Sequence, residues 1–227
     1  MDSLFKTQIM LVLLLVVSAL FFPPKNEELL YQNSLLEKEE VRLYNIRQLT
    51  FSGENAEAYF SANGKRLIFQ SHDGDSLCDQ IYVMDIASRQ AEMVSTGNGV
   101  TTCSYFGYPD CNNIIYASTH LANKTCPEKP DYSKGYVWKL YPGYDIFMAD
   151  LNGSIIGQLT NSPGYDAEAT VAFNGSKIIY TSIMSGDLEV WSMDKDGSNK
   201  KQLTDRLGYD GGAFFNMDAT KIVWRVY

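Results

Sequence analysis

The stretch of sequence that decides the fold begins Thr160-Asn-Ser-Pro-Gly-Tyr-Asp-Ala-Glu-Ala-Thr-Val-Ala-Phe-Asn-Gly-Ser-Lys-Ile-Ile-Tyr-Thr-Ser182. It continues through Gly186-Asp-Leu-Glu-Val-Trp-Ser-Met-Asp194 and closes on Lys201-Gln-Leu-Thr204. The tripeptide Gln-Leu-Thr also occurs at 48–50 and 158–160, so the last two copies lie 44 residues apart and the longer first interval holds two units. Self-similarity with a period of about 40 to 50 residues is typical of solenoids and propellers.

Each unit predicts a four-stranded antiparallel meander. In the first repeat, about 49–95, we expect strands at 56–60, 66–71, 80–85 and 91–94, preceded by an alternating strand at 41–49. The further repeats span 96–160, with an insertion at 119–144, then 161–204 and a partial copy at 205–227. The pairs Asn63-Gly64 and Asn174-Gly175 predict type I′ turns, because both residues tolerate the positive φ that this turn requires.

The repeats resemble those of TolB-type propellers over residues 41–227. The likeness rests on Gln-Leu-Thr, Gly164-Tyr-Asp-Ala-Glu168, Asn174-Gly-x-Lys-Ile-Ile-Tyr180 and Gly186-Asp-Leu-Glu-Val-Trp-Ser-Met-Asp-x-Asp-Gly-Ser198. The usual Ser-Pro-Asp-Gly turn is replaced by Ser61-Ala-Asn-Gly64, Ala172-Phe-Asn-Gly175 and Asn216-Met-Asp-Ala219, which keep turn chemistry.

This resemblance implies an all-β fold, a β-propeller of four-stranded antiparallel blades. About three and a half blades are present, whereas the family's propeller is typically six-bladed, and residues 23–40 leave no room for the N-terminal domain of TolB. An incomplete ring leaves unpaired edge strands, which favour association. We therefore expect either a fragment of a longer protein or a complete chain that closes its ring by dimerising.

Composition and the N-terminal segment bear on compartment and partners. Residues 1–24 contain an apolar run, 9–22, that is too short for a typical membrane span and predicts an export signal or an uncleaved anchor, followed by a linker or short helix at 25–40. A periplasmic or extracellular location is therefore expected, with membrane contact only through this segment. The formal net charge of −8 argues against nucleic acid as a partner.

One rim of the propeller is expected to carry the site. In an up-and-down blade, the loop between the second and third strands and the connection to the next blade share one end of the sheet. We call this end the insertion-bearing rim, because it also carries 119–144, whereas the opposite rim has mainly tight turns. The insertion-bearing rim is predicted to hold Glu57, His72, Asp73, Asp75, Cys78, Asp79, Cys103, His120, Cys126, Asp166, Glu168, Asp187 and Asp210.

The cysteines divide between the two rims. Cys78, Cys103 and Cys126 belong to the insertion-bearing rim and Cys111 to the other, so two clean disulfides are not expected. One bridge among the first three is predicted, with Cys103 to Cys126 ahead of Cys78 to Cys103. The alternatives are buried free thiols, or a metal site with His72 or His120, for which no ligand spacing provides support.

Carboxylates and histidines are the candidates for catalysis. Aligning the repeats puts Glu57, Cys103, Glu168 and Gly212 at one equivalent position near the channel mouth. If the protein is an enzyme, Glu57 and Glu168 would act as acid and base, or hold a divalent cation together with Asp166 and Asp210. The structural alternative is that these carboxylates bind neighbouring backbone, and that His72 and His120 cap loops.

The insertion supplies the candidate binding surface. It contains three prolines, Cys126 and the run Gly135-Tyr-Val-Trp-Lys-Leu-Tyr-Pro-Gly-Tyr144, and long loops on rigid scaffolds tend to carry function. These aromatic side chains either bind a partner or pack the insertion against its blade. With Asp166 and Asp210, the predicted binding residues are Tyr136, Trp138, Tyr141 and Tyr144.

Three functions remain open from the sequence. The first is an exported scaffold that binds protein or peptide at the insertion-bearing rim, without a cofactor, which agrees with the cell-envelope interaction role implied by the resemblance. The second is a propeller hydrolase or lyase that uses carboxylates at the channel mouth. The third is the accessory propeller of a longer peptidase, whose Gly-x-Ser-x-Gly elbow is absent from this chain.

Overall fold

The structure, a computed structural model, describes residues 41–74, 78–128, 130–135, 137 and 139–227. The chain divides into two compact units, 1–51 and 52–227. The predicted signal or anchor at 1–24 and the linker at 25–40 lie outside the described residues. Within 41–50 no strand forms, so the prediction of a strand at 41–49 was wrong. In the part of the chain that can be described, no helix has the length and apolar character that crossing a membrane requires.

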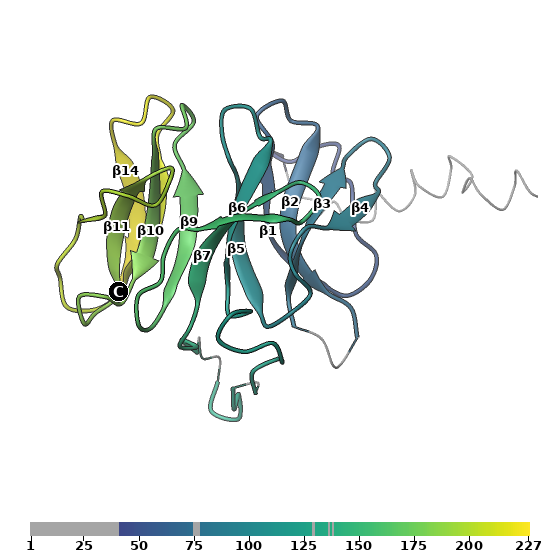
Figure 1. Ribbon diagram of the computed structural model, residues 1–227. Coiled ribbons are helices and arrows are strands. Elements are labelled where there is room, and N and C mark those ends of the chain that lie inside the picture. Colours follow the sequence, from purple (N-terminus) through teal and green to yellow (C-terminus); the bar gives the residue numbers. More distant parts are fainter. Residues whose placement is uncertain (1–40, 75–77, 129, 136, 138) are drawn as a thin grey trace, which may run out of the picture. The chain divides into compact units, whose positions relative to one another are not determined.

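The second unit consists of antiparallel sheets that follow one another along the chain, as the ribbon in Figure 1 shows. Blade one contains β1 (Glu54–Phe60), β2 (Arg66–His72), β3 (Gln80–Asp85) and β4 (Ala91–Met93). Blade two contains β5 (Thr101–Phe106), β6 (Asn113–Ser118), β7 (Asp145–Asp150) and β8 (Ile155–Gln158). Blade three contains β9 (Asp166–Val171), β10 (Lys177–Ser182), β11 (Glu189–Asp194) and β12 (Lys201–Gln202), and half-blade four contains β13 (Asp210–Phe215) and β14 (Ile222–Val226).

Each inner blade buries both faces of its sheet. Along β6, Ile114 and Tyr116 pack into the cluster shared with blade one, whereas Ile115 between them packs into the cluster shared with blade three. Along β10, Tyr180 faces blade two and Ile179 faces half-blade four. Because strand side chains alternate between faces, this two-sided burial explains why the second strands are almost continuously apolar.

The repeated tripeptide occupies the same place in blades two and three. The hydroxyls of Thr160 and Thr204 each accept a hydrogen bond of 2.9 Å from the backbone N–H of the second residue of a third strand, Ile146 in β7 and Val190 in β11. In blade one Ser95 takes this role towards Ile81 at the same distance. The copy at 48–50 lies before the first sheet and shares only a local feature, a hydrogen bond from the glutamine side chain to the threonine carbonyl, 2.6 Å long there and 2.7 Å long at 202–204.

The blades are joined by a second repeated contact. The backbone N–H at the start of each following first strand donates to a carbonyl at or just before the third strand of the preceding blade. These pairs are Thr101 to Asp79 (2.9 Å), Asp166 to Tyr144 (3.0 Å) and Asp210 to Leu188 (2.8 Å). The connections therefore lie beside the loops between second and third strands, as expected for the insertion-bearing rim. The all-β propeller fold predicted from the repeats is confirmed.

The Asn-Gly hairpins differ from the prediction. Positive φ is found at Gly64 (65°) and Gly175 (70°), whereas the asparagine of each pair uses its side chain as a hydrogen-bond acceptor. Asn63 Oδ1 accepts from the backbone of Lys65 at 3.0 Å, and Asn174 accepts likewise from the backbone N–H two residues ahead. The predicted type I′ turn is therefore wrong, because a longer loop places only the glycine in the left-handed region.

Candidate functional site

A β-bulge recurs at one position in the first strand of every blade. The residue at the bulge has a φ of 51° at Glu57, 52° at Cys103, 55° at Glu168 and 59° at Gly212. The pairing register shifts at the same point in each of β1, β5, β9 and β13. A left-handed conformation costs a non-glycine residue about 1 to 2 kcal/mol. We call these four positions the bulge ring, and their equivalence matches the alignment of the repeats.

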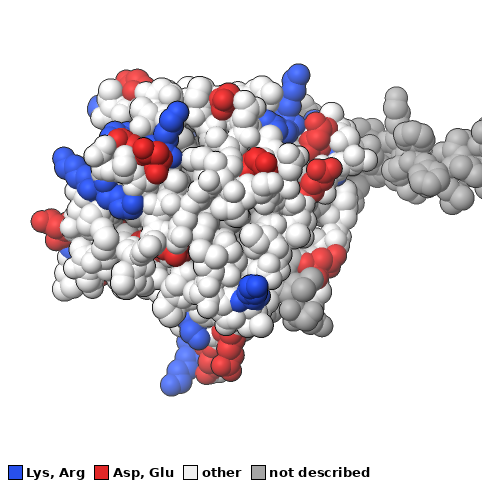
Figure 2. Space-filling model, in the orientation of Figure 1, with Lys and Arg blue, Asp and Glu red and all other residues white. Residues whose placement is uncertain are grey.

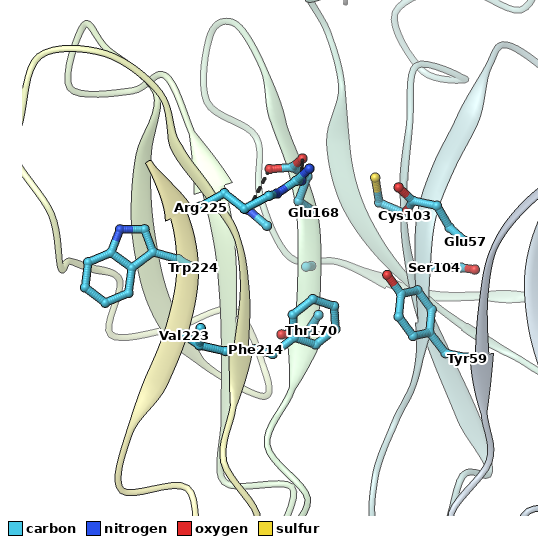
Figure 3. A pocket seen from close by; sticks show the side chains of 12 residues that line it. Glu57, Tyr59, Cys103, Ser104, Glu168, Thr170, Phe214, Val223, Trp224 and Arg225 are labelled. Atoms are coloured by element: carbon cyan, nitrogen blue, oxygen red, sulfur yellow. Dashed lines mark hydrogen bonds and ion pairs between the residues drawn. The ribbon is translucent and has the colours of Figure 1, made fainter. Parts of the chain in front are cut away.

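The bulge ring points its side chains at a common pocket of about 360 Å³. Figure 3 shows Glu57, Cys103 and Glu168 at one level across the strands, with the Arg225 guanidinium beside them. Tyr59 and Phe214 line the pocket below this level.

Glu168 acts as a hydrogen-bonding hub between blade three and half-blade four. Its Oε2 accepts from the Thr181 hydroxyl (2.7 Å), the Tyr209 hydroxyl (2.7 Å) and the Gly212 backbone N–H (2.9 Å), while Arg225 Nη2 lies 3.2 Å from Oε1. Burial and the Glu168 charge raise the pKa of Tyr209, which keeps that phenol a donor. These contacts give Glu168 a structural role in holding two blades together.

Arg225 occupies the space that a side chain on the fourth bulge would need. A Cβ built on Gly212 would lie 2.5 Å from Arg225 Nη2 and 2.8 Å from its Nε. The guanidinium also lies over the Tyr209 ring, 5.7 Å from its centroid. The bulge ring therefore has three side chains and, in the fourth place, an arginine that reaches in from β14.

Cys103 and Glu57 are the other two side chains of the bulge ring, and their surroundings do not activate the Cys103 thiol as a nucleophile. Burial raises the pKa of the Cys103 thiol well above its usual value, and the charges of Glu57 and Glu168 add to the shift. Partial burial also raises the pKa of Glu57, against the opposing effect of a hydrogen bond with Cys103. The thiolate is the reactive form of cysteine, so this environment keeps Cys103 unreactive at neutral pH.

Asp166 and Asp210 lie within the blade boundaries, each only 1% exposed. Ser162 donates to Asp166 and Trp224 Nε1 donates to Asp210 at 3.0 Å, and in each aspartate the other carboxylate oxygen has no partner among the described residues. Burial, followed by the Asp166 charge, raises the pKa of Asp145 to about 6. The structure thus places these two predicted binding residues inside the scaffold rather than on its surface.

The two histidines are not brought together. His72 Nδ1 lies 2.6 Å from Asp79 Oδ1, beside the loop between β2 and β3. The His120 ring is 9% exposed and lies 4.2 Å, between centroids, from the Phe147 ring, and burial lowers its pKa. No group of three histidine, cysteine, aspartate or glutamate side chains suited to a metal ion occurs in the described ranges.

The disulfide joins Cys78 to Cys126, with a Cα–Cα distance of 5.6 Å, whereas Cys103 and Cys111 are free and buried. One bridge among the cysteines of the insertion-bearing rim was expected, but both favoured pairings used Cys103 and were wrong. Cys103 belongs to the bulge ring, where its thiol contacts Glu57. Near the start of the insertion, the Gly99 backbone N–H donates to the Lys124 carbonyl (2.8 Å), two residues before Cys126.

The insertion and blade one enclose a second pocket of about 410 Å³ on the insertion-bearing rim, which we call the rim pocket. Tyrosine side chains dominate its wall on the insertion side, and carboxylates lie on the blade-one side. Of the predicted aromatic residues, Tyr141 and Tyr144 line the pocket, Tyr144 being 4% exposed, while Tyr136 and Trp138 lie outside the described residues. The rim pocket is lined by Glu54, Asn55, Ala56, Gln70, Asp79, Val100, Thr102, Pro130, Tyr132, Val137, Lys139, Tyr141, Tyr144 and Tyr165.

Sequence reasoning missed the residues that come from neighbouring blades. Arg225 and Tyr209 reach the bulge ring from half-blade four, and Tyr165 reaches the rim pocket from the start of blade three. The glycine at the fourth aligned position, Gly212, could have indicated that a side chain from another strand fills this place, because a missing side chain in a ring of aligned positions leaves space for another group. Arg225 is the residue that does so.

Comparison with known proteins bears on the fold. No family model and no curated protein sequence matches the chain. Among solved structures, TolB from Acinetobacter baumannii aligns with a TM-score of 0.51 at 24% identity, covering 71% of this chain and 36% of that one. A nidogen/laminin complex aligns with a TM-score of 0.55 at 12% identity, covering 74% of this chain and 55% of that one. The chain thus spans well under two thirds of the length of either protein.

These similarities and the repeated sheets lead to one conclusion about the fold. Three complete blades, a half-blade and the recurring bulge agree with the repeats from which a propeller was predicted. In its fold, this chain is a β-propeller of four-stranded antiparallel blades, similar to the blades of TolB and of the nidogen/laminin complex.

Proposed function

We propose that this protein is an exported propeller scaffold that binds a protein or peptide at its insertion-bearing rim. The observation that carries the proposal is the insertion between β6 and β7, which is held in place and encloses a pocket on the exposed end of the blades. Figure 1 places this segment and the β2–β3 loop at the same end of the blades. Binding residues commonly lie on loops that a rigid scaffold positions.

Several contacts support a fixed insertion rather than a loose one. The disulfide ties it to blade one, the Tyr141 hydroxyl donates to the Glu128 carbonyl at 2.9 Å, and the Gly143 N–H donates to the Gly164 carbonyl at 2.8 Å. A loop that is already ordered loses less conformational entropy when it binds. These contacts favour a binding surface that exists before the partner arrives.

The proposed export rests on cysteine chemistry. Disulfides persist in oxidising compartments and are rare in the cytosol of mesophiles. The Cys78–Cys126 bridge and the apolar run at 9–22 therefore support a periplasmic or extracellular location.

The proposal is tested by peptide display against the full chain and against a shortened variant. In the variant, residues 120–143 are replaced by Met-Ser-Gly-Asp, which fills this place in blade three at 184–187, and Cys78 is changed to serine. Ser118 pairs with Asp145 in blade two as Ser182 pairs with Glu189 in blade three, so the hairpin has a suitable closure. Peptides that bind the full chain and not the shortened variant support the function. Failure to select any peptide, or equal binding to both proteins, contradicts it.

A further inference from the structure

We propose that the rim pocket receives a lysine or arginine side chain of an extended peptide. This inference rests on the function proposed above and names the chemical class of its ligand. Three features of the pocket support it: an aromatic wall, a cation that the chain itself places there, and carboxylates on the opposite wall.

Four tyrosines form the aromatic wall of the rim pocket: Tyr132, Tyr141, Tyr144 and Tyr165. The rings of Tyr144 and Tyr165 meet edge to face at 5.5 Å between centroids, and the ring of Tyr141 lies 6.4 Å from that of Tyr144. Tyr132 remains 50% exposed at the pocket mouth. The face of an aromatic ring attracts a cation, and this attraction strengthens when the cation loses part of its water.

The chain already places an ammonium group against this wall. The Lys139 Nζ atom lies 5.2 Å from the centroid of the Tyr141 ring, and Lys139 lines the same pocket. Lys139 therefore stands in for the basic side chain of a peptide. Because the two cations would compete for one ring, Lys139 should weaken binding of a basic ligand.

Two carboxylates on the blade-one wall provide negative charge that a basic side chain could pair with. His72 lies 2.6 Å from Asp79 Oδ1 and Gln70 donates to Oδ2 at 3.0 Å, so the Asp79 carboxylate is fixed in orientation. The Glu54 side chain is 83% exposed at the start of β1 and also lines the pocket. Among the residues that line the pocket, two carboxylates stand against one lysine, which leaves a formal negative charge when His72, which contacts both carboxylates, is counted as neutral.

The surroundings suit the whole of such a side chain. Val100, Pro130 and Val137 give the pocket an apolar section, and the aliphatic stem of lysine or arginine packs on apolar surface while its head remains polar. Figure 2 shows that both signs of charge occur on the projecting segment at the lower edge, below a largely uncharged face. The chain's net charge of −8 would attract a basic partner over longer distances.

The experiment begins with the peptides selected by display on the full chain. For one such peptide, fluorescence anisotropy measures the affinity before and after each lysine or arginine is replaced by glutamine. Loss of the basic side chain should weaken binding about tenfold, which corresponds to about 1.4 kcal/mol. On the protein, Glu54→Gln should weaken binding about threefold, and Lys139→Met should strengthen it. The matched control is Glu92→Gln, which removes an exposed carboxylate from β4, outside the pocket lining.

The outcomes separate this inference from the function on which it rests. Selected peptides that lack basic residues, or that bind equally well after the glutamine replacement, would overturn the inference while peptide binding itself stands. A display experiment that yields no peptide overturns both. Weaker binding by the Lys139→Met variant would also contradict the inference, since it would assign the rim pocket to an acidic ligand.

Discussion

Removing the Cys78–Cys126 bridge should destabilise the propeller substantially, because the bridge closes a long loop. The two cysteines are 48 residues apart, and the segment between them contains β3, β4, β5 and β6. In the chain-entropy model, closing a loop of this length reduces the entropy of the unfolded chain by about 14 cal/mol/K, which stabilises the fold by about 4 kcal/mol at 25 °C. The full effect requires that blades one and two unfold together.

The perturbation is the double variant Cys78→Ser with Cys126→Ser, which leaves the buried thiols of Cys103 and Cys111 in place. Guanidinium denaturation followed by tryptophan fluorescence, at neutral pH with and without dithiothreitol, gives the free energy of unfolding. We expect the free energy of unfolding of the oxidised parent to be about 4 kcal/mol higher than that of the double variant. Dithiothreitol should lower the free energy of unfolding of the parent and leave that of the double variant unchanged. A difference below about 1 kcal/mol would refute the argument, because it would mean that the four enclosed strands do not unfold as one unit.

Three further predictions concern the bulge ring and the blade boundaries. Glu168→Ala should lower the free energy of unfolding by about 2 to 4 kcal/mol in urea denaturation, because it leaves the buried Thr181 hydroxyl and the partly buried donors of Tyr209 and Gly212 without their acceptor, whereas the exposed control Glu92→Ala should change it by less than about 0.5 kcal/mol. Gly212→Ala should cost about 1 to 2 kcal/mol in the same assay, since its φ is 59° and its Cβ would meet Arg225, and unchanged stability would contradict this geometry. The folded pKa of Asp145, about 6, lies above its ordinary value of 3.8, so its contribution to stability is greatest at acidic pH and is lost as the pH rises through about 4 to 6. Asp145→Asn should remove this part of the pH dependence of stability, about 1 kcal/mol after solvent screening, and identical pH curves for parent and variant would exclude it.

The blades could be predicted because their sequence pattern follows from packing. A sheet between two others buries both faces, so Ile114, Ile115 and Tyr116 appear as one apolar run, and the turns and threonine contacts repeat at fixed offsets. The strand expected at 41–49 also alternates, yet no strand forms there. The alternation of apolar and polar residues indicates which face of a segment would be buried in a sheet, but it does not show that a neighbouring strand is present to pair with it.

The site was harder to predict because it depends on contacts between blades. Alignment of the repeats located the bulge ring, since every copy has the same local backbone. It did not reveal Arg225, which lies 57 residues after its partner Glu168, or the bridge partner of Cys126, which the insertion reaches across a blade boundary. Such contacts are set by the path of a long loop and by the side chains of a neighbouring sheet, and a repeat pattern records neither of them.

The bulge ring has a consequence for how propellers of this kind diversify. At these positions the left-handed backbone disfavours valine, isoleucine and threonine but admits glycine, asparagine, aspartate and, at modest cost, unbranched side chains. The same backbone already carries glutamate, cysteine and glycine in neighbouring copies. Each sheet thus supplies one position whose side chain faces the shared pocket. Replacing the residue at such a position changes the chemistry of the pocket without altering the strand pairing, at a cost in stability set by the contacts that the original residue made.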